Sequence, residues 1–213
     1  MKYMFVIVAL MLTLSSVVPA QTDTSLASTK TPEVMLWGGL SLPYLPLDYR
    51  TFWKSGYNIG AGIGYSLDPG STGYGSFFAT LDYGRTNFDT KKYNDSLKLT
   101  HPADSAIGGA VTLVNVMVIF KGSFSSTKKS VAPYFLLGVG VMNFTVAETY
   151  FTPNTSLTIP GINKWGVSWT FGVGIEAPVT ESVRAFVQAK SLLGVTEQTR
   201  QYFPITAGVV YTL

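Results

Sequence analysis

Apolar residues alternate with small or polar residues along several stretches of the chain. Between Tyr57 and Leu67 every odd position is apolar or aromatic, and every even position is Asn, Gly or Ser. The same alternation runs from Trp165 to Ala177 and again from Phe203 to Leu213. Because successive side chains of a strand point to opposite faces, this pattern predicts β-strands.

The face opposite the apolar one indicates the surroundings of these strands. It is mainly Gly, Ser and Thr, which cover a soluble protein poorly but suit the crowded interior of a narrow barrel. We therefore expect the apolar face to contact lipid and the small polar face to line the interior. A soluble lipocalin-like binder, whose apolar faces would line a cavity, is the less favoured alternative.

Eight such segments are predicted, at residues 33–42, 56–67, 74–86, 107–121, 131–144, 165–177, 183–192 and 202–213. The connections alternate in length, with longer ones near 43–55, 87–106, 145–164 and 193–201 and shorter ones near 68–73, 122–130 and 178–182. This asymmetry is typical of outer-membrane barrels. We predict an all-β fold, an eight-stranded antiparallel up-and-down transmembrane β-barrel with both ends in the periplasm. The register stays open in the first strand, where Trp37 fits either face, and in the fourth.

The N-terminus has the pattern of a cleaved export signal. Lys2 precedes an apolar run from Phe5 to Leu14, and Val18-Pro19-Ala20 forms a small-residue cleavage site. We predict a signal peptide at residues 1–20, a short periplasmic segment at 21–32 and the barrel at 33–213. No later apolar run reaches the ~20 residues that a spanning helix needs.

Composition narrows the chemistry of this 213-residue chain. It is 46% hydrophobic and 13% charged, has a net charge of +3, and contains one His and no Cys. These counts exclude a disulfide scaffold and a Cys nucleophile, and they give no support for nucleic-acid binding, a metal or a cofactor. A lipid A acyltransferase or deacylase using His101 with Asp104 and Ser105 is an alternative, but their spacing matches no known motif of such enzymes. No enzymatic activity is expected.

Polar side chains on the inward face predict a filled interior. The candidates are Asp82, Lys121, Glu176, Arg184, Gln188 and Lys190. A turn centred on Thr180 would place Glu176 opposite Arg184, Gly174 opposite Phe186 and Gly172 opposite Gln188. Opposite charges attract across strands, and a ring over a glycine fixes register. We expect a stabilising plug; the alternative is a narrow pore for ions or small solutes that opens when the ion pairs exchange.

The first outer loop is the candidate interaction surface, and its members are Tyr44, Tyr49, Arg50, Phe52, Trp53 and Lys54. Aromatic residues with arginine suit an extracellular protein or glycan ligand. In the alternative, the aromatics pack as a lid or extend the aromatic girdle. Basic residues expected near the outer rim, where they would pair with lipopolysaccharide phosphates, are Arg50, Lys54, Arg85, Lys91 and Lys92.

Three strand sequences carry a family resemblance: Asn58-Ile-Gly-Ala-Gly-Ile-Gly-Tyr65, Pro133-Tyr134 leading to Gly138-Val-Gly140, and Phe171-Gly-Val-Gly-Ile-Glu176. With the alternating final strand, the chain over 33–213 resembles the small eight-stranded outer-membrane β-barrels, OmpA-like or OmpX-like. The resemblance implies a bacterial outer-membrane location, contact with outer-membrane lipid and lipopolysaccharide, and recognition of the C-terminal strand by the barrel-assembly machinery. Leu213 departs from the family's terminal aromatic residue, and we expect Tyr211 to supply part of that signal.

The function expected from these observations is non-enzymatic. We expect an integral outer-membrane protein whose surface-exposed loops serve envelope integrity, adhesion or surface interaction.

Overall fold

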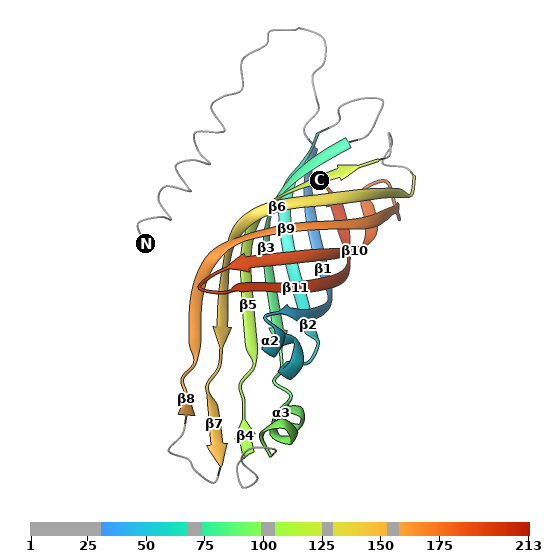
Figure 1. Cartoon of the computed structure of the whole chain (residues 1–213). Helices are drawn as coiled ribbons and strands as arrows, with labels where there is room; N and C mark the ends of the chain where they lie inside the picture. Colours follow the sequence, from blue (N-terminus) through green and yellow to red (C-terminus); the bar gives the residue numbers. More distant parts are fainter. Residues whose placement is uncertain (1–30, 68–73, 99–104, 125–129, 153–157) are drawn as a thin grey trace, which may run out of the picture.

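The computed structural model describes residues 31–67, 74–98, 105–124, 130–152 and 158–213. Eight strands form a closed antiparallel barrel in the order β1-β11-β10-β9-β6-β5-β3-β2 (Figure 1). Their bounds are β1 Thr31–Leu45, β2 Gly56–Leu67, β3 Tyr74–Thr86, β5 Val111–Ser123, β6 Ala132–Val146, β9 Ile162–Pro178, β10 Val183–Val195 and β11 Thr199–Thr212. Each strand pairs with its neighbours along the barrel, and the β1–β11 pair closes it. The predicted fold class is confirmed, while residues 1–20 and nearly all of 21–32 lie outside the described residues.

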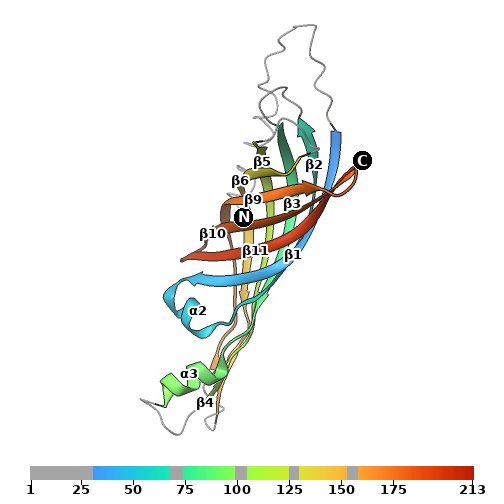
Figure 2. The ribbon, with the colours of Figure 1, turned by 90° about the vertical axis from the view of Figure 1, so that its right-hand side faces the viewer.

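Further folded elements gather at one end of the barrel. They are α2 (Leu47–Phe52), α3 (Thr90–Leu97) and a three-stranded sheet of β4 (Ser105–Ile107), β7 (Thr149–Thr152) and β8 (Thr158–Ile159). Figures 1 and 2 show these elements projecting beyond the barrel. We call this the loop end, and we call the opposite end, where β1 begins and β11 ends, the turn end. Neither of the two helices in the described chain is long and apolar enough to cross a membrane.

Strand bounds follow the predictions closely, except where Gly108 and Gly109 divide one predicted strand. β2 and β3 have the predicted bounds, 56–67 and 74–86. The predicted strand at 107–121 instead starts at Val111, and Ile107 ends the separate strand β4. Gly108 and Gly109 separate the two; a Cβ on Gly109 would lie 2.3 Å from the Cβ of Ala147. At these glycines the chain passes from the loop-end sheet into the barrel wall.

The apolar face of the strands points outward. On β9, Trp165, Phe171 and Val173 are 66%, 54% and 65% exposed, whereas Ser168 and Thr170 between them are buried. A closed barrel leaves no strand edge with unpaired backbone groups. Its continuous apolar exterior suits the hydrocarbon of a bilayer. The expected orientation is confirmed, and the chain forms a transmembrane barrel of the outer-membrane type.

Aromatic rings cluster near both ends of the outer surface. At the loop end the ring centroids of Tyr57 and Tyr83 lie 6.1 Å apart. At the turn end the ring of Phe120 contacts Phe77 at 5.1 Å and Phe135 at 5.8 Å. Two such belts match the two membrane–water interfaces, where aromatic side chains concentrate.

The structure settles the two registers that the sequence left open. Trp37 is buried inside the barrel, whereas its neighbour Leu36 is 52% exposed. On β5, Met117 and Asn115 are buried and Val116 faces outward. Both faces of β5 are largely apolar, so alternation alone does not distinguish them.

The predicted pairing of the β9–β10 hairpin is wrong by two residues. The structure pairs Glu176 with Phe186, Gly174 with Gln188 and Gly172 with Lys190. The hydroxyl of Thr180 accepts hydrogen bonds from the backbone N–H groups of Ser182 and Val183 at 3.3 and 3.1 Å. This side-chain turn lengthens the connection, and its midpoint falls on Glu181, halfway between the paired residues Pro178 and Arg184.

Rings do cover glycines, but in other pairs than the predicted Phe186 over Gly174. Tyr134 on β6 covers Gly174 on β9, and Phe186 on β10 covers Gly208 on β11. A Cβ added to Gly174 would lie 2.4 Å from Cζ of Tyr134. These close approaches favour one register on each side of β9 and β10.

Candidate functional site

Charged side chains fill the barrel interior. The six predicted interior residues come from β3, β5, β9 and β10, and none is more than 4% exposed: Asp82, Lys121, Glu176, Arg184, Gln188 and Lys190. Glu33 on β1 joins them at 1% exposure. The interior thus holds three acids and three bases, so its formal charge is balanced at neutral pH.

The larger cluster lies toward the turn end. Arg184 Nη2 lies 2.8 Å from Glu33 Oε1, and Arg184 Nε lies 3.6 Å from Glu176 Oε2. Lys121 Nζ lies 2.7 Å from the same Glu176 oxygen, and the hydroxyl of Tyr74 donates to the other oxygen. These contacts tie β1, β3, β5, β9 and β10 together across the lumen.

A second cluster lies further along the interior. Lys190 Nζ donates to Asp82 Oδ1 at 3.1 Å, and Trp37 Nε1 donates to the same oxygen at 3.0 Å. The Lys190 ammonium also sits 5.0 Å from the Trp37 ring centroid. Gln188 accepts a hydrogen bond from the Tyr134 hydroxyl at 3.1 Å. Both charged groups of this cluster therefore have partners, as burial of charge requires, although Asp82 Oδ2 accepts no hydrogen bond from a described residue.

Sequence reasoning missed Glu33 and Trp37 because the register of the first strand was open. A signal was nevertheless present in the charge balance. The predicted interior contained three cations but only the two acids Asp82 and Glu176, and an unpaired buried cation is costly. Placing Glu33 on the inward face supplies the third acid. It also puts Trp37 on that face, because residues four apart in a strand point to the same side.

The predicted loop surface divides into a packed half and an exposed half. In the packed half, Tyr49 is 2% exposed, and its hydroxyl lies 3.1 Å from the Thr86 hydroxyl. Burial raises the pKa of Tyr49 to about 12, although the hydrogen bond to Thr86 acts in the opposite direction. Its ring contacts Trp53 at 5.6 Å and Phe144 at 6.0 Å. Tyr49 thus anchors α2 to the mouth of the barrel.

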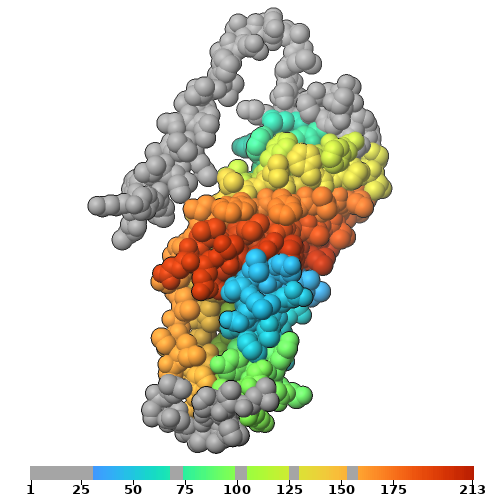
Figure 3. Space-filling model, in the orientation of Figure 1, coloured from blue at the N-terminus to red at the C-terminus, as the bar shows by residue number. Residues whose placement is uncertain are grey.

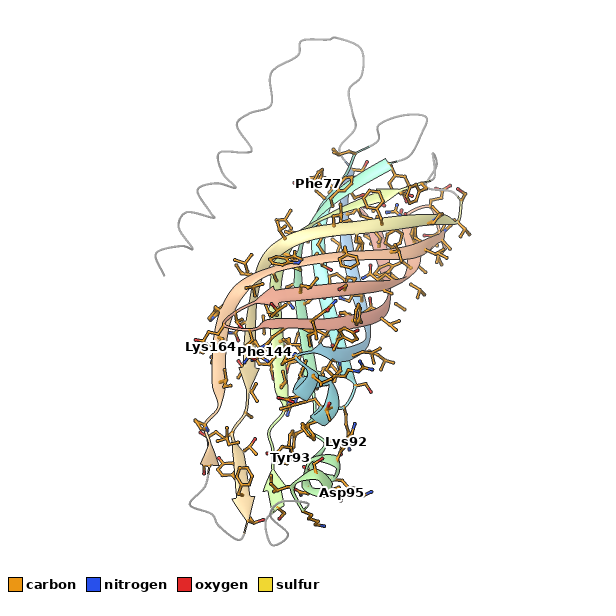
Figure 4. The ribbon with its side chains drawn as sticks, in the orientation of Figure 1. Phe77, Lys92, Tyr93, Asp95, Phe144 and Lys164 are labelled. Carbon is orange, nitrogen blue, oxygen red and sulfur yellow. The ribbon has the colours of Figure 1, made fainter. Side chains whose placement is uncertain are left out.

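Phe52 and Trp53 also pack against other rings. Phe52 contacts Tyr93 of α3 at 5.0 Å, and Trp53 contacts Phe88 at 5.0 Å. Phe88 and Tyr93 in turn lie 5.1 Å apart. Figure 4 labels Tyr93 and Phe144, both toward the loop end, with Phe77 at the other end. The rings join α2, α3 and the barrel mouth into one packed unit.

Tyr44, Arg50 and Lys54 form the exposed half. The Arg50 guanidinium lies 5.4 Å from the Tyr44 ring centroid, and Lys54 Nζ lies 3.8 Å from Asp89 Oδ1. In the space-filling view of Figure 3, the α2 segment occupies the surface between β10–β11 and α3. These side chains are accessible to a partner at the loop end.

Of the three residues considered for a lipid A enzyme, the structure describes only Ser105. Ser105 Oγ lies 2.8 Å from Thr152 Oγ1 inside the loop-end sheet. His101 and Asp104 lie outside the described residues. Within the described part of the chain, no group of three or more His, Cys, Asp or Glu residues is arranged to hold a metal ion.

Comparison with known proteins identifies the fold but no family. No protein-family model matches the sequence, and no curated protein matches it either. The solved structure of Neisserial surface protein A aligns with a TM-score of 0.56 and 14% identity, covering 85% of this chain and 97% of that one. This likeness shows that the two chains share the eight-stranded barrel fold.

Two further solved barrels align over similar lengths. The N-terminal β-barrel domain of Pseudomonas aeruginosa OprF gives a TM-score of 0.46 and 15% identity, covering 86% of this chain and 97% of that one. The Yersinia pestis attachment invasion locus protein Ail gives a TM-score of 0.45 and 10% identity, with coverage of 86% and 98%.

Proposed function

We propose that this protein is a non-enzymatic outer-membrane barrel that displays its loop end at the cell surface for adhesion, surface interaction or envelope integrity. The observation that carries the proposal is the contrast along the barrel axis. The lumen holds six paired, nearly inaccessible charges, whereas the loop end holds folded elements with exposed side chains. One solved protein of the same fold is named as a surface protein, which supports the proposed location of the loop end.

Single cysteines test which end faces outward, because the natural chain has none. Lys91→Cys on α3 marks the loop end, and Glu181→Cys marks the turn end; both positions are exposed. A membrane-impermeant thiol reagent should label the Lys91 variant in intact cells and the Glu181 variant only after the outer membrane is permeabilised. The reverse pattern would refute surface display of the loop end.

Surface display predicts a phenotype that depends on the exposed half of the loop surface. Cells carrying the triple replacement Tyr44→Ser, Arg50→Ser and Lys54→Ser should lose surface adhesion while keeping the barrel in the membrane. The matched control is Glu181→Ser at the turn end. Equal adhesion and equal permeability to large antibiotics in deletion, variant and unmodified strains would contradict the proposal.

A conducting pore is the second candidate function. For ions to pass, the buried ion pairs of the lumen would have to exchange partners. The plug interpretation predicts no conductance above background in planar bilayers for the unmodified protein. It also predicts none for Arg184→Ala, since Lys121 and Lys190 still fill the lumen. Discrete ion-selective openings that change in the Arg184 variant would favour the pore.

The basic side chains at the loop end suit lipopolysaccharide phosphates. Arg50, Lys54, Arg85, Lys91 and Lys92 are all exposed, and charge-assisted hydrogen bonds to phosphate are strong and salt-sensitive. Replacing Arg85 and Lys91 by Gln should reduce the lipopolysaccharide that co-purifies with the protein. Lys98→Gln, at the opposite end of α3 from Lys91, provides a control. Unchanged co-purification would remove this partner.

The C-terminal strand is the proposed contact for the barrel-assembly machinery. Tyr211 is exposed on β11, where an aromatic side chain of the assembly signal is expected, and Leu213 follows the strand. Leu213→Phe should therefore speed appearance of the folded, heat-modifiable form in pulse-chase experiments, whereas Tyr211→Ser should slow it. Equal rates for both variants would argue against recognition at this strand.

A further inference from the structure

A cavity of about 280 Å³ opens between the barrel mouth and the loop-end elements. Its walls come from α2, α3, the start of β5, the end of β6, and the β10–β11 hairpin. A cavity of roughly 150 Å³ holds a benzene molecule, so this one has room for a compound of one or two rings. Phe144 and Tyr93, two of its lining residues, are labelled in Figure 4.

The walls of the cavity are aromatic and held in place by one another. Five lining residues form a continuous chain of ring contacts, at centroid distances of 5.0 to 6.0 Å: Phe144, Tyr49, Trp53, Phe88 and Tyr93. Because each ring is fixed by its neighbours, the cavity does not collapse when empty. Flat apolar walls of this kind favour a ring system over an aliphatic chain.

Arg200 brings a positive charge to the same cavity. Its guanidinium carbon lies 3.7 Å from the Phe144 ring centroid, and its Nε is buried without a hydrogen-bond partner. Among the described residues no carboxylate lies within ion-pair distance of Arg200, whereas Lys121, Arg184 and Lys190 each have one at 2.7 to 3.1 Å. A partly desolvated guanidinium without an acceptor favours the arrival of an anion.

A second donor lines the cavity without a partner. Trp53 Nε1 is buried and makes no hydrogen bond, although indole N–H groups are usually partnered when buried. Leaving such a group unsatisfied is unfavourable, and a ligand acceptor would relieve it. The cavity therefore combines walls of aromatic side chains with two buried donors, Trp53 Nε1 and Arg200 Nε, and the positive charge of Arg200. Asp48 and Gln198, both exposed, complete its polar edge.

We propose that this cavity is a binding site for a small aromatic carboxylate, with the ring system packed against Trp53 and Phe144 and the carboxylate paired with Arg200. A planar carboxylate matches the fork of guanidinium donors, and the stacked Phe144 ring fixes that fork in orientation. The site is separate from the charged plug, because the lining residues of the cavity include none of the six buried charges. Ligand capture at the loop end extends the proposed surface role to small molecules.

The probe for this site is 2-naphthoate, titrated by calorimetry into the full-length barrel in lipid nanodiscs. It should bind in a saturable 1:1 manner. The neutral 2-naphthamide keeps the rings but not the charge, and acetate keeps the charge but not the rings. Both should bind at least ~10-fold more weakly, since one charge-assisted hydrogen bond or one ring contact contributes about that factor. Equal binding of naphthoate and naphthamide would overturn the proposal.

Matched arginine variants locate the binding site. Arg200→Gln should weaken naphthoate binding by at least ~10-fold, and Arg50→Gln, whose side chain lies on α2 outside the cavity, should leave it unchanged. Heat-modifiable migration establishes that each variant is folded. If Arg200→Gln does not fold, Trp53→Phe keeps an aromatic ring at this position but removes the indole N–H donor, and it should weaken naphthoate binding more than naphthamide binding. Equal losses at positions 200 and 50, or no saturable binding at all, would refute the site.

Discussion

Two arginines near aromatic rings show how differently the two ends of the barrel use the same chemistry. Arg184, toward the turn end, is 4% exposed and lies within 2.8 and 3.6 Å of two carboxylates, with the Tyr74 ring at 5.7 Å. Arg200, at the loop end, has the Phe144 ring at 3.7 Å and no acidic partner among the described residues. The first arginine is paired with two acids of the protein itself, although its Nε makes no hydrogen bond to a described residue. The second is open to an acidic partner from outside.

Replacing each arginine in turn should give the largest difference in the free energy of unfolding between the two ends of the barrel. Arg184→Ala removes the guanidinium that pairs with Glu33 and Glu176 in the barrel interior, so it should lower the free energy of unfolding by about 3–5 kcal/mol. Arg200→Ala loses a ring contact but also an unpaired charge, and should change stability by less than ~1 kcal/mol. Urea unfolding in micelles, followed by gel migration, measures both. Equal losses would contradict the comparison.

Two glycines, one in each half of the barrel, differ in the space beside them. A Cβ on Gly174 would lie 2.4 Å from Tyr134 Cζ and 2.7 Å from the Val187 carbonyl oxygen, whereas one on Gly84, nearer the loop end, meets nothing closer than 3.7 Å. Gly174→Ala should therefore cost about 1–3 kcal/mol, and Gly84→Ala should stay within ~0.5 kcal/mol. The same urea titration applies. A larger loss at Gly84 would show that the space beside a glycine does not set the cost of the added methyl group.

The smallest expected effect concerns the anchor of α2. Tyr49→Phe removes the hydrogen bond to Thr86 and should cost about 1 kcal/mol at neutral pH. Because burial raises the folded-state pKa of Tyr49 from 10.0 to about 12, ionisation in the unfolded state begins first. The stability advantage of the unmodified protein should consequently decline as pH rises from 10 toward 12. A constant difference across that interval would mean that the phenol is not buried.

The barrel was predictable from the sequence because its signal repeats in every strand. Alternation gave the bounds of β2 and β3 and the outward face of β9. It failed where side chains on both faces are apolar, as on β5, and where register depends on a turn. The Thr180 hydroxyl, which no periodicity reports, moved the β9–β10 pairing by two residues.

The loop-end elements were not predicted, for a different reason. α3 is a polar helix without a buried residue, so it has no apolar stripe to detect; its local signal is Asp89, whose carboxylate accepts from the Lys92 N–H. β4, β7 and β8 are two to four residues long, too short for alternation to be read. The aromatic residues of the first loop were identified, but their ring contacts with Phe88, Tyr93 and Phe144 and the position of Arg200 beside them depend on contacts between distant segments.

Closure of the barrel through β1 and β11 has a consequence for how the protein forms. Glu33 and Arg184 are separated by 151 positions in the chain, and β1 meets its last neighbour only when β11 arrives. Until β11 pairs with β1, the barrel wall has two strand edges without a neighbour. Contacts of such long sequence separation slow folding, so we expect closure of the β1–β11 pair to be a late step in the formation of the barrel.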